Sequence, residues 1–372
     1  MQALVGVTVL GFASYCLTLA SLPVYAVAGG AAESSAGVVT AAFLVVTLAV
    51  QLTVPALTAR LGVGPVLMAG LFAMGLPAPF YVLGDSVEWI SALSAVRGAG
   101  FAVLTVLGAT LAAQVAPPER RGESIGLYGL AIAVPNLVAV PAGVALVLDG
   151  HIAWVSWLAA SPVLGAFLVP LLMRSTAPQP GPGPAGTRRA AVLAALAPSL
   201  VLFVVTLAGG GLVTFLPIER PDGVLATVAL LLFGITGAVT RWRAGMVADR
   251  LGSRLLLPLA LVVAALGMVL TGAGLWAGPV WVLIGASVFG AGFGATQNLT
   301  LLAAFARAGA SGTTTASAMW NIAFDAGMAV GALALGFLAA GIGLDWTYVV
   351  VGALLAAAVP LASAAARAAV HS

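Results

Sequence analysis

Charged residues are scarce in this sequence, which has 14 basic and 11 acidic side chains among 372 residues. A soluble domain carries about 25% charged residues, so these side chains are too few to cover a water-facing surface. Disordered chains are poor in apolar residues, whereas 62% of this chain is hydrophobic. The composition therefore predicts an integral membrane protein whose apolar side chains face lipid.

Lysine is absent, and all the basic residues are arginines without a clustered basic face. Nucleic acid is therefore not an expected partner. Cys16 is the only cysteine, so it forms no internal disulfide and is expected to pack as a small apolar residue. No metal-binding cluster, catalytic triad or phosphate-binding loop stands out, so we expect neither enzymatic activity nor a cofactor.

Long apolar runs fill most of the chain. A helix rises about 1.5 Å per residue, so about 20 apolar residues cross a hydrocarbon core of about 30 Å. The pattern predicts an all-α polytopic membrane protein with twelve spans. The predicted spans are 3–28, 36–58, 65–84, 89–115, 123–148, 152–173, 190–217, 224–243, 254–274, 279–306, 313–340 and 345–367.

The arginines between these spans predict the orientation, because cytoplasmic loops are enriched in basic residues. With the N-terminus inside, Arg220 is the only basic residue in an outer loop. The inner segments hold Arg60, Arg120, Arg121, Arg174, Arg188, Arg189, Arg241, Arg243, Arg250, Arg254, Arg307 and Arg367. We therefore expect a multi-pass protein of the plasma (inner) membrane with both termini cytoplasmic. The first run is too long for a secretory signal.

Two similar halves are separated by a proline-rich stretch. Residues 178–184 read Pro-Gln-Pro-Gly-Pro-Gly-Pro, which is incompatible with a helix. We predict a six-helix bundle over 1–173, a cytoplasmic linker over 174–189 and a second bundle over 190–372. Three matches share an offset near 190: Ala59–Gly62 with Asp249–Gly252, Arg97–Phe101 with Phe289–Phe293, and Tyr128 with Trp320. Transporters built from such repeats bind substrate between the halves near the midplane.

The segment Gly245–Arg254 resembles the signature loop of the major facilitator superfamily, G-x-x-x-D-R-x-G-x-R. A first copy, Pro55–Gly64, has lost the acid. Arg97 followed by Gly-Ala-Gly resembles the family's fourth-span motif, and Gly126–Gly143 is similar to a degenerate antiporter motif. The resemblance implies a secondary transporter in which the loop acid caps a helix end of the other half. The implied gating residues are Gly245, Asp249, Arg250, Gly252, Arg254 and Arg60.

Asp325 lies deep in the eleventh predicted span, four residues after Asn321 on the same helix face. A charge at the bilayer centre costs about 2.5–3.5 kcal/mol. Burial raises a carboxyl pKa and a nearby cation lowers it, so Asp325 is a candidate for loading and releasing a proton. The alternative is a structural carboxylate bonded to a neighbouring helix.

Arg97 in the fourth span does not readily lose its proton, so it is not the proton carrier. It is a candidate for binding an anionic substrate group or for keeping Asp325 ionised; the alternative is a fixed ion pair or bonds to helix carbonyls. Other polar and aromatic side chains in spans are candidates for substrate binding or for interhelical bonding. With Asn321 and Arg97, the candidates are Trp320, Tyr15, Gln51, Asn136, Gln297 and Asn298.

The main functional prediction is a proton-coupled exporter, an antiporter that moves a small organic compound by alternating access. The alternative is an uptake symporter or facilitator for a sugar, an organic acid or an amino-acid-like metabolite. A non-transporting membrane receptor is a third reading, without a sizeable soluble domain to support it. The expected partners are a small-molecule substrate, protons and the lipid bilayer, and the chain is expected to act as a monomer.

Overall fold

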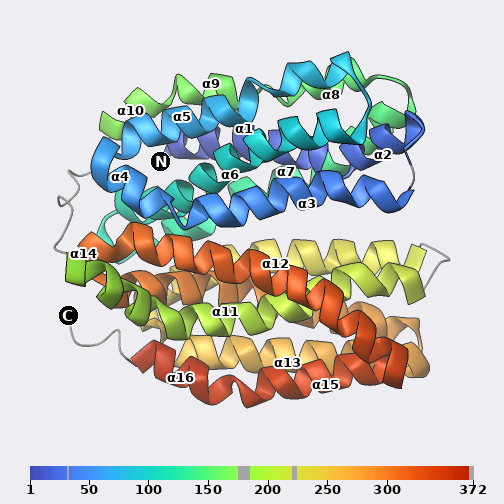
Figure 1. The fold of residues 1–372 in the computed structure, drawn as a ribbon. Helices are drawn as coiled ribbons and strands as arrows, with labels where there is room; N and C mark the ends of the chain where they lie inside the picture. Colours follow the sequence, from blue (N-terminus) through green and yellow to red (C-terminus); the bar gives the residue numbers. More distant parts are fainter. Residues whose placement is uncertain (32, 175–184, 220–223, 368–372) are drawn as a thin grey trace. The chain divides into compact units, whose positions relative to one another are not determined.

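The structure is a computed structural model that describes residues 1–31, 33–174, 185–219 and 224–367 (Figure 1). Within these ranges every regular element is helical, which confirms the predicted all-α class. The first part contains α1 (Gln2–Leu19), α2 (Ser21–Ala28), α3 (Glu33–Gln51), α4 (Val54–Leu61), α5 (Val63–Gly75), η1 (Ala78–Leu83), α6 (Val87–Val115), η2 (Pro118–Arg120), α7 (Arg121–Leu148), α8 (Ile152–Leu158), α9 (Pro162–Ala166) and α10 (Val169–Arg174). It is followed by α11 (Ala185–Glu219), α12 (Val224–Leu251), α13 (Ser253–Ala277), α14 (Pro279–Ile342), α15 (Leu344–Ala357) and α16 (Val359–Arg367).

These helices form twelve candidate membrane spans over the ranges above. Ten helical stretches are long and apolar enough to cross a bilayer, and the pair α3–α4, bent by 54°, is an eleventh. The 64-residue α14 contains Gly309 at φ 68° and ψ 179°, which is not helical and divides α14 into two helices. The predicted twelve-span architecture is thereby confirmed.

Several spans consist of consecutive short helices, and proline accounts for some of the breaks. Pro55, Pro162 and Pro360 each lie at the first or second position of the helix that follows a break. Proline has no backbone N–H, so it fits the first turn of a helix, where that group has no intrahelical partner. These spans therefore bend while still crossing the apolar layer.

Two compact units make up the described chain. One contains Met1–Val115 and Ala131–Pro182, and the other contains Ala116–Leu130 and Gly183–Ser372. The first turns of α7 thus belong with the second unit, whereas our prediction assigned all of 1–173 to the first bundle. Most of the predicted linker (175–184) and the predicted outer-loop arginine, Arg220, lie outside the described residues.

The two units share an internal packing pattern. In the first, α6 packs against α3 and α5; in the second, α14 packs against α12 and α13 (Figure 1). A Cβ atom at Gly98 would clash with the Phe43 carbonyl oxygen, and one at Gly290 would clash with that of Phe233. Gly290 and Phe233 follow their counterparts by 192 and 190 residues, so the sequence repeat corresponds to equivalent close helix contacts.

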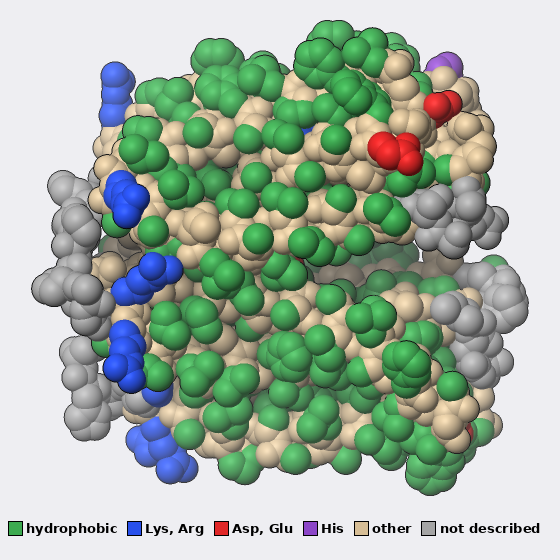
Figure 2. Space-filling view, in the orientation of Figure 1, with side chains coloured by type: hydrophobic (Ala, Val, Ile, Leu, Met, Phe, Trp, Pro, Cys, Tyr) green, Lys and Arg blue, Asp and Glu red, His purple; other side chains and the backbone are tan. Residues whose placement is uncertain are grey.

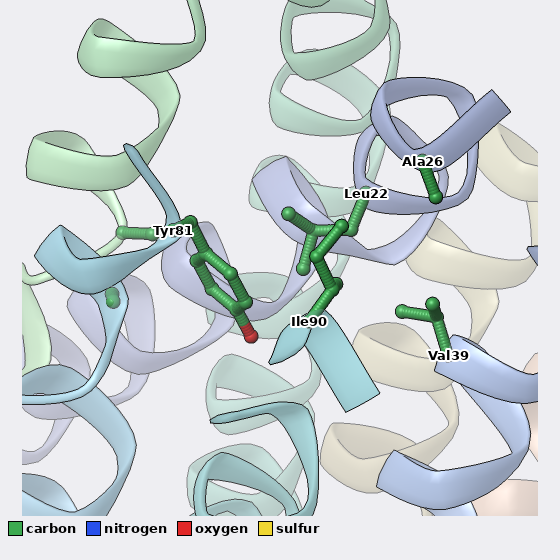
Figure 3. Packing of buried hydrophobic residues seen from close by; sticks show 7 residues of the cluster. Leu22, Ala26, Val39, Tyr81 and Ile90 are labelled. Carbon is green, nitrogen blue, oxygen red and sulfur yellow. The ribbon is translucent and has the colours of Figure 1, made fainter. Parts of the chain in front are cut away.

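In the first unit, a cluster of buried apolar side chains packs near one end of the helices (Figure 3). Leu22 and Ile90 are almost fully buried, and Tyr81 packs with them. The Tyr81 hydroxyl lies 2.9 Å from Ser94 Oγ and accepts a hydrogen bond from Arg97 (3.2 Å). The cluster therefore provides an anchor for Arg97.

Apolar side chains cover much of the face of each unit that Figure 2 shows. Phe337, Leu251 and Phe167 are among the most exposed, and such a surface is suited to lipid rather than water. In the first unit, the visible arginines lie at one end of the helices and the carboxylates at the other (Figure 2). On this face, the charges of the first unit thus gather at the helix ends.

The eighth span differs from its prediction. We placed its end at residue 243, whereas α12 continues to Leu251. Gly245, Asp249 and Arg250 are therefore helical, and the turn itself is formed by Gly252, which has φ 75°. Glycine adopts positive φ without the steric cost that a side chain would add. The predicted loop is in fact the last turns of a helix.

Candidate functional site

Asp249, in the last turn of α12, caps the start of α7 within the second unit. Its Oδ1 accepts the backbone N–H of Gly122 (2.8 Å), and its Oδ2 accepts that of Glu123 (2.9 Å). The first N–H groups of a helix have no intrahelical partner and carry the positive end of the helix dipole. A carboxylate in this position forms charge-assisted hydrogen bonds, so Asp249 ties α7 to α12.

Glycines let α7 approach α12 closely beside this cap. A Cβ atom at Gly126 would lie 2.7 Å from Trp242 Cα, and one at Gly129 would lie 2.5 Å from Arg241 Nε. A Cβ atom at Gly245 would clash with the carbonyl oxygen of Gly122. The glycines of the degenerate fifth-span motif therefore have a definite role, since any side chain there would push the helices apart.

Asn298, in the first half of α14, joins the same two helices. Its Nδ2 donates to the Arg241 carbonyl (2.9 Å) on α12 and to the Gly122 carbonyl (3.2 Å) on α7. Its side chain is fully buried. Asn298 was a substrate-binding candidate, and here it connects α7, α12 and α14.

Arg241 is a buried cation in the interior of α12, with 8% of its surface exposed. Its Nη1 donates to Gln297 Oε1 (2.8 Å), and its guanidinium lies 5.8 Å from the centre of the Trp320 ring. Gln297 and Trp320, both substrate-binding candidates, are thus brought together around one arginine.

The second half of α14 carries the predicted proton site. Asp325 lies near the middle of the helix that follows Gly309 and is half-buried. One turn earlier, Asn321 Nδ2 donates to the Ser317 carbonyl (2.9 Å). Trp320 stacks on Phe324 at 5.8 Å and donates its Nε1–H to Thr300 (3.0 Å). The assignment of proton coupling to Asp325 stays a prediction.

Arg97, on α6 in the first unit, is 1% exposed and bonded to neutral oxygens. Its Nε donates to the Met74 carbonyl (3.0 Å) and its Nη1 to the Tyr81 hydroxyl (3.2 Å). Its Nη2 donates to both the carbonyl (3.2 Å) and the hydroxyl (2.8 Å) of Ser14. Within the first unit, Arg97 therefore joins three spans through helix carbonyls and hydroxyls. Its role in binding substrate or in keeping Asp325 ionised stays a prediction.

A cavity of about 20 Å³ adjoins Arg97, lined also by Tyr15, Phe43 and Thr18. A volume of this size holds about one water molecule. Tyr15 stacks on Phe101, with ring centres 4.3 Å apart. This space inside the first unit is thus too small for an organic substrate.

The remaining candidates of the first unit are separate from Arg97. Gln51 is buried, and its Nε2 lies 3.5 Å from Thr105 Oγ1. Asn136 is exposed and donates to the carbonyl of Ile132 (3.0 Å), one turn earlier in α7. A substrate role for either residue remains a prediction.

The predicted gating arginines lie at helix ends. Arg60, Arg250 and Arg254 are all exposed. Arg254 and Arg121 line an open cavity of about 460 Å³ next to the Asp249 cap. Nearby, Arg120 forms an exposed ion pair with Glu123 (2.8 Å), and this hydrogen bond raises the pKa of Arg120.

Sequence reasoning missed Arg241, which we counted among the inner-segment arginines. Its position was readable in principle, since Arg241, Gly245 and Asp249 recur every four residues and so share a helix face. Ending the predicted helix at 243 concealed this pattern.

The chain matches the Major Facilitator Superfamily over residues 3–325. It belongs to the major facilitator superfamily. The family is one of transporters, so the protein is a multi-pass membrane transporter. No curated protein sequence matches the chain.

Solved structures of this superfamily share its fold. One is FucP in the outward conformation, with a TM-score of 0.80 at 15% identity over 98% of each chain; another structure of FucP is described as the E. coli fucose:proton symporter. The human organic anion transporter MFSD10 has a TM-score of 0.77 at 16% identity, over 97% of this chain and 98% of that chain. The proton:xylose symporter XylE has a TM-score of 0.73 at 16% identity, over 96% and 93%. At these identities the likeness concerns the fold alone.

Proposed function

We propose that this chain is a proton-coupled secondary transporter that imports a small polar metabolite through the plasma membrane by alternating access. The observation that carries the proposal is Asp325, a half-buried carboxylate in the middle of a span of a major facilitator transporter. Ionisable residues inside membrane spans are costly and mark ion or substrate pathways. Asp325 takes a proton on one side of the membrane and releases it on the other.

The Asp249 cap acts as the cytoplasmic gate. Two hydrogen bonds hold the start of α7 on α12, and a carboxylate at a helix N-terminus contributes about 0.3–1 kcal/mol, or about 2 kcal/mol when partly buried. A contact of this strength closes the gate and still breaks in every cycle. With the arginine-rich segments inside, this gate and both termini face the cytoplasm.

Symport is the preferred direction of coupling. Structures with the same fold include fucose:proton and proton:xylose symporters, which supports the uptake alternative more than export. Export remains a second candidate because α7 contains Pro135 and Pro141 together with the glycines of the antiporter-like motif. The transporter works as a monomer without a cofactor, and the proton gradient supplies its energy.

Purified protein in vesicles under an imposed pH gradient tests this proposal. The solutes are radiolabelled fucose, xylose, glucuronate and benzoate. A symporter accumulates its solute when the outside is acidic, whereas an antiporter accumulates it when the inside is acidic. Vesicles without protein are the control. If the protein moved the solutes at rates that did not depend on the pH gradient, proton coupling would be contradicted.

A further inference from the structure

Arg241 carries a buried positive charge whose hydrogen-bond donors are only partly used. One donor bonds Gln297, and Nε has no hydrogen-bond partner among the described residues. Burying a cation without a partner is costly, and such groups in membrane spans usually have a functional reason.

Arg97 provides an internal comparison. It is also buried, and four hydrogen bonds to neutral oxygens occupy its three nitrogens. Arg241 has one such bond, from Nη1 to Gln297. All three nitrogens of the Arg97 guanidinium thus donate hydrogen bonds within its own unit. The Arg241 guanidinium retains N–H groups that can donate to a further acceptor.

The cover over Arg241 is the start of α7. Gly129 packs directly against Arg241 Nε. The Asp249 cap holds this segment against α12 at a point eight residues after Arg241, which corresponds to about 12 Å along the helix. When the cap breaks and α7 withdraws, the unpartnered Nε edge of Arg241 loses its cover.

We infer that Arg241 binds the carboxylate of an organic anion substrate once the gate beside it has opened. The guanidinium fork matches a carboxylate with two parallel hydrogen bonds. Gln297 holds the fork through Nη1, and the buried Trp320 ring forms an apolar wall next to it. This inference rests on the alternating access proposed above and names the substrate class as a small organic acid.

Binding to the detergent-purified full chain tests this site without any gradient. The probes are two matched pairs, glucuronate with glucose and benzoate with benzamide, and the readout is ligand-dependent thermal stabilisation. At least one carboxylate should stabilise the protein while its neutral partner does not. Replacing Arg241→Gln should lower the affinity by about tenfold or more.

The control is Arg243→Gln, which removes an exposed arginine from the same helix and should leave binding unchanged. If Arg241→Gln does not fold, Arg241→Lys retains the charge and should keep the carboxylate preference with weaker affinity. The Asp249→Asn variant, in which the cap is weaker, should bind the carboxylate several-fold more tightly because the competent state is more populated. A carboxylate that bound equally well with the cap closed and with the cap open would not show that gain.

Two results would overturn the inference: no carboxylate preferred over its neutral partner, or unchanged carboxylate binding by folded Arg241→Gln. Failure of the transport proposal would look different. A protein that binds the carboxylate through Arg241 but moves no solute under a pH gradient would refute proton-coupled transport and leave the site intact.

Discussion

The Asp249 carboxylate accepts the backbone N–H of Gly122 at 2.8 Å, across 127 residues of sequence. Asp249 lies in the last turn of α12 and Gly122 in the first turn of α7, so one side chain connects the eighth span to the fifth. This contact belongs to the second unit even though most of α7 lies in the first.

Replacing Asp249→Asn should loosen the cap, because the amide has no charge and only one acceptor oxygen. A loss of about 1–2 kcal/mol changes an equilibrium about 5–30-fold. The reporter is a cysteine replacing the buried Ser124, and the native Cys16 is fully buried. Maleimide should label the cysteine at position 124 about 5–30-fold faster when Asp249 is replaced by Asn than when Asp249 is intact.

The matched control for this variant is Glu123→Gln. It also removes one acidic charge at the start of α7, but Glu123 contributes its backbone N–H to the cap and its side chain to an exposed ion pair. Exposed pairs contribute about 0–1 kcal/mol. Equal labelling rates in both acid variants would argue against the cap as a gate.

Replacing Gly126→Val should separate α7 from α12, because the first added carbon would lie 2.7 Å from Trp242 Cα. We expect a lower melting temperature and slower transport. The matched control is Gly234→Ala on α12, where nothing lies within 4 Å of the added carbon. Alanine in an open helix position should be neutral or stabilise the helix by about 0.5–1 kcal/mol. A fully active and stable Gly126→Val protein would show that the close approach is dispensable.

Replacing Arg97→Lys should destabilise the first unit, since lysine lacks the planar fork that reaches Met74, Tyr81 and Ser14 together. Each hydrogen bond to a charged group contributes about 1.5–3 kcal/mol, so losing two costs about 3 kcal/mol or more. Thermal unfolding in detergent measures this loss. The control is Arg60→Lys, which changes an exposed arginine. An Arg97→Lys protein with the melting temperature of the wild type would refute the anchoring role.

Sequence reasoning predicted the spans well because a helix that crosses the bilayer needs a long apolar run. Such a run can be recognised in the sequence without knowing which helices pack against it. The family resemblance implied that Asp249 caps a helix end, and the structure identifies that end as the start of α7. The end of α12 was wrong because Arg241, Arg243 and Arg250 read as water-facing. Arg241 is buried there by groups from α7 and α14. The four-residue spacing of Arg241, Gly245 and Asp249 shows a shared helix face, but the helices that cover this face come only from the structure.

Asp325 provides the most direct test of proton-coupled transport. In vesicles that contain the variant Asp325→Asn, exchange of labelled for unlabelled substrate needs no net proton movement, whereas accumulation against a gradient does. We predict that Asp325→Asn keeps exchange and loses accumulation driven by an acidic exterior. Wild-type accumulation by this variant under the same pH gradient would contradict the role of Asp325 as the proton-carrying carboxylate.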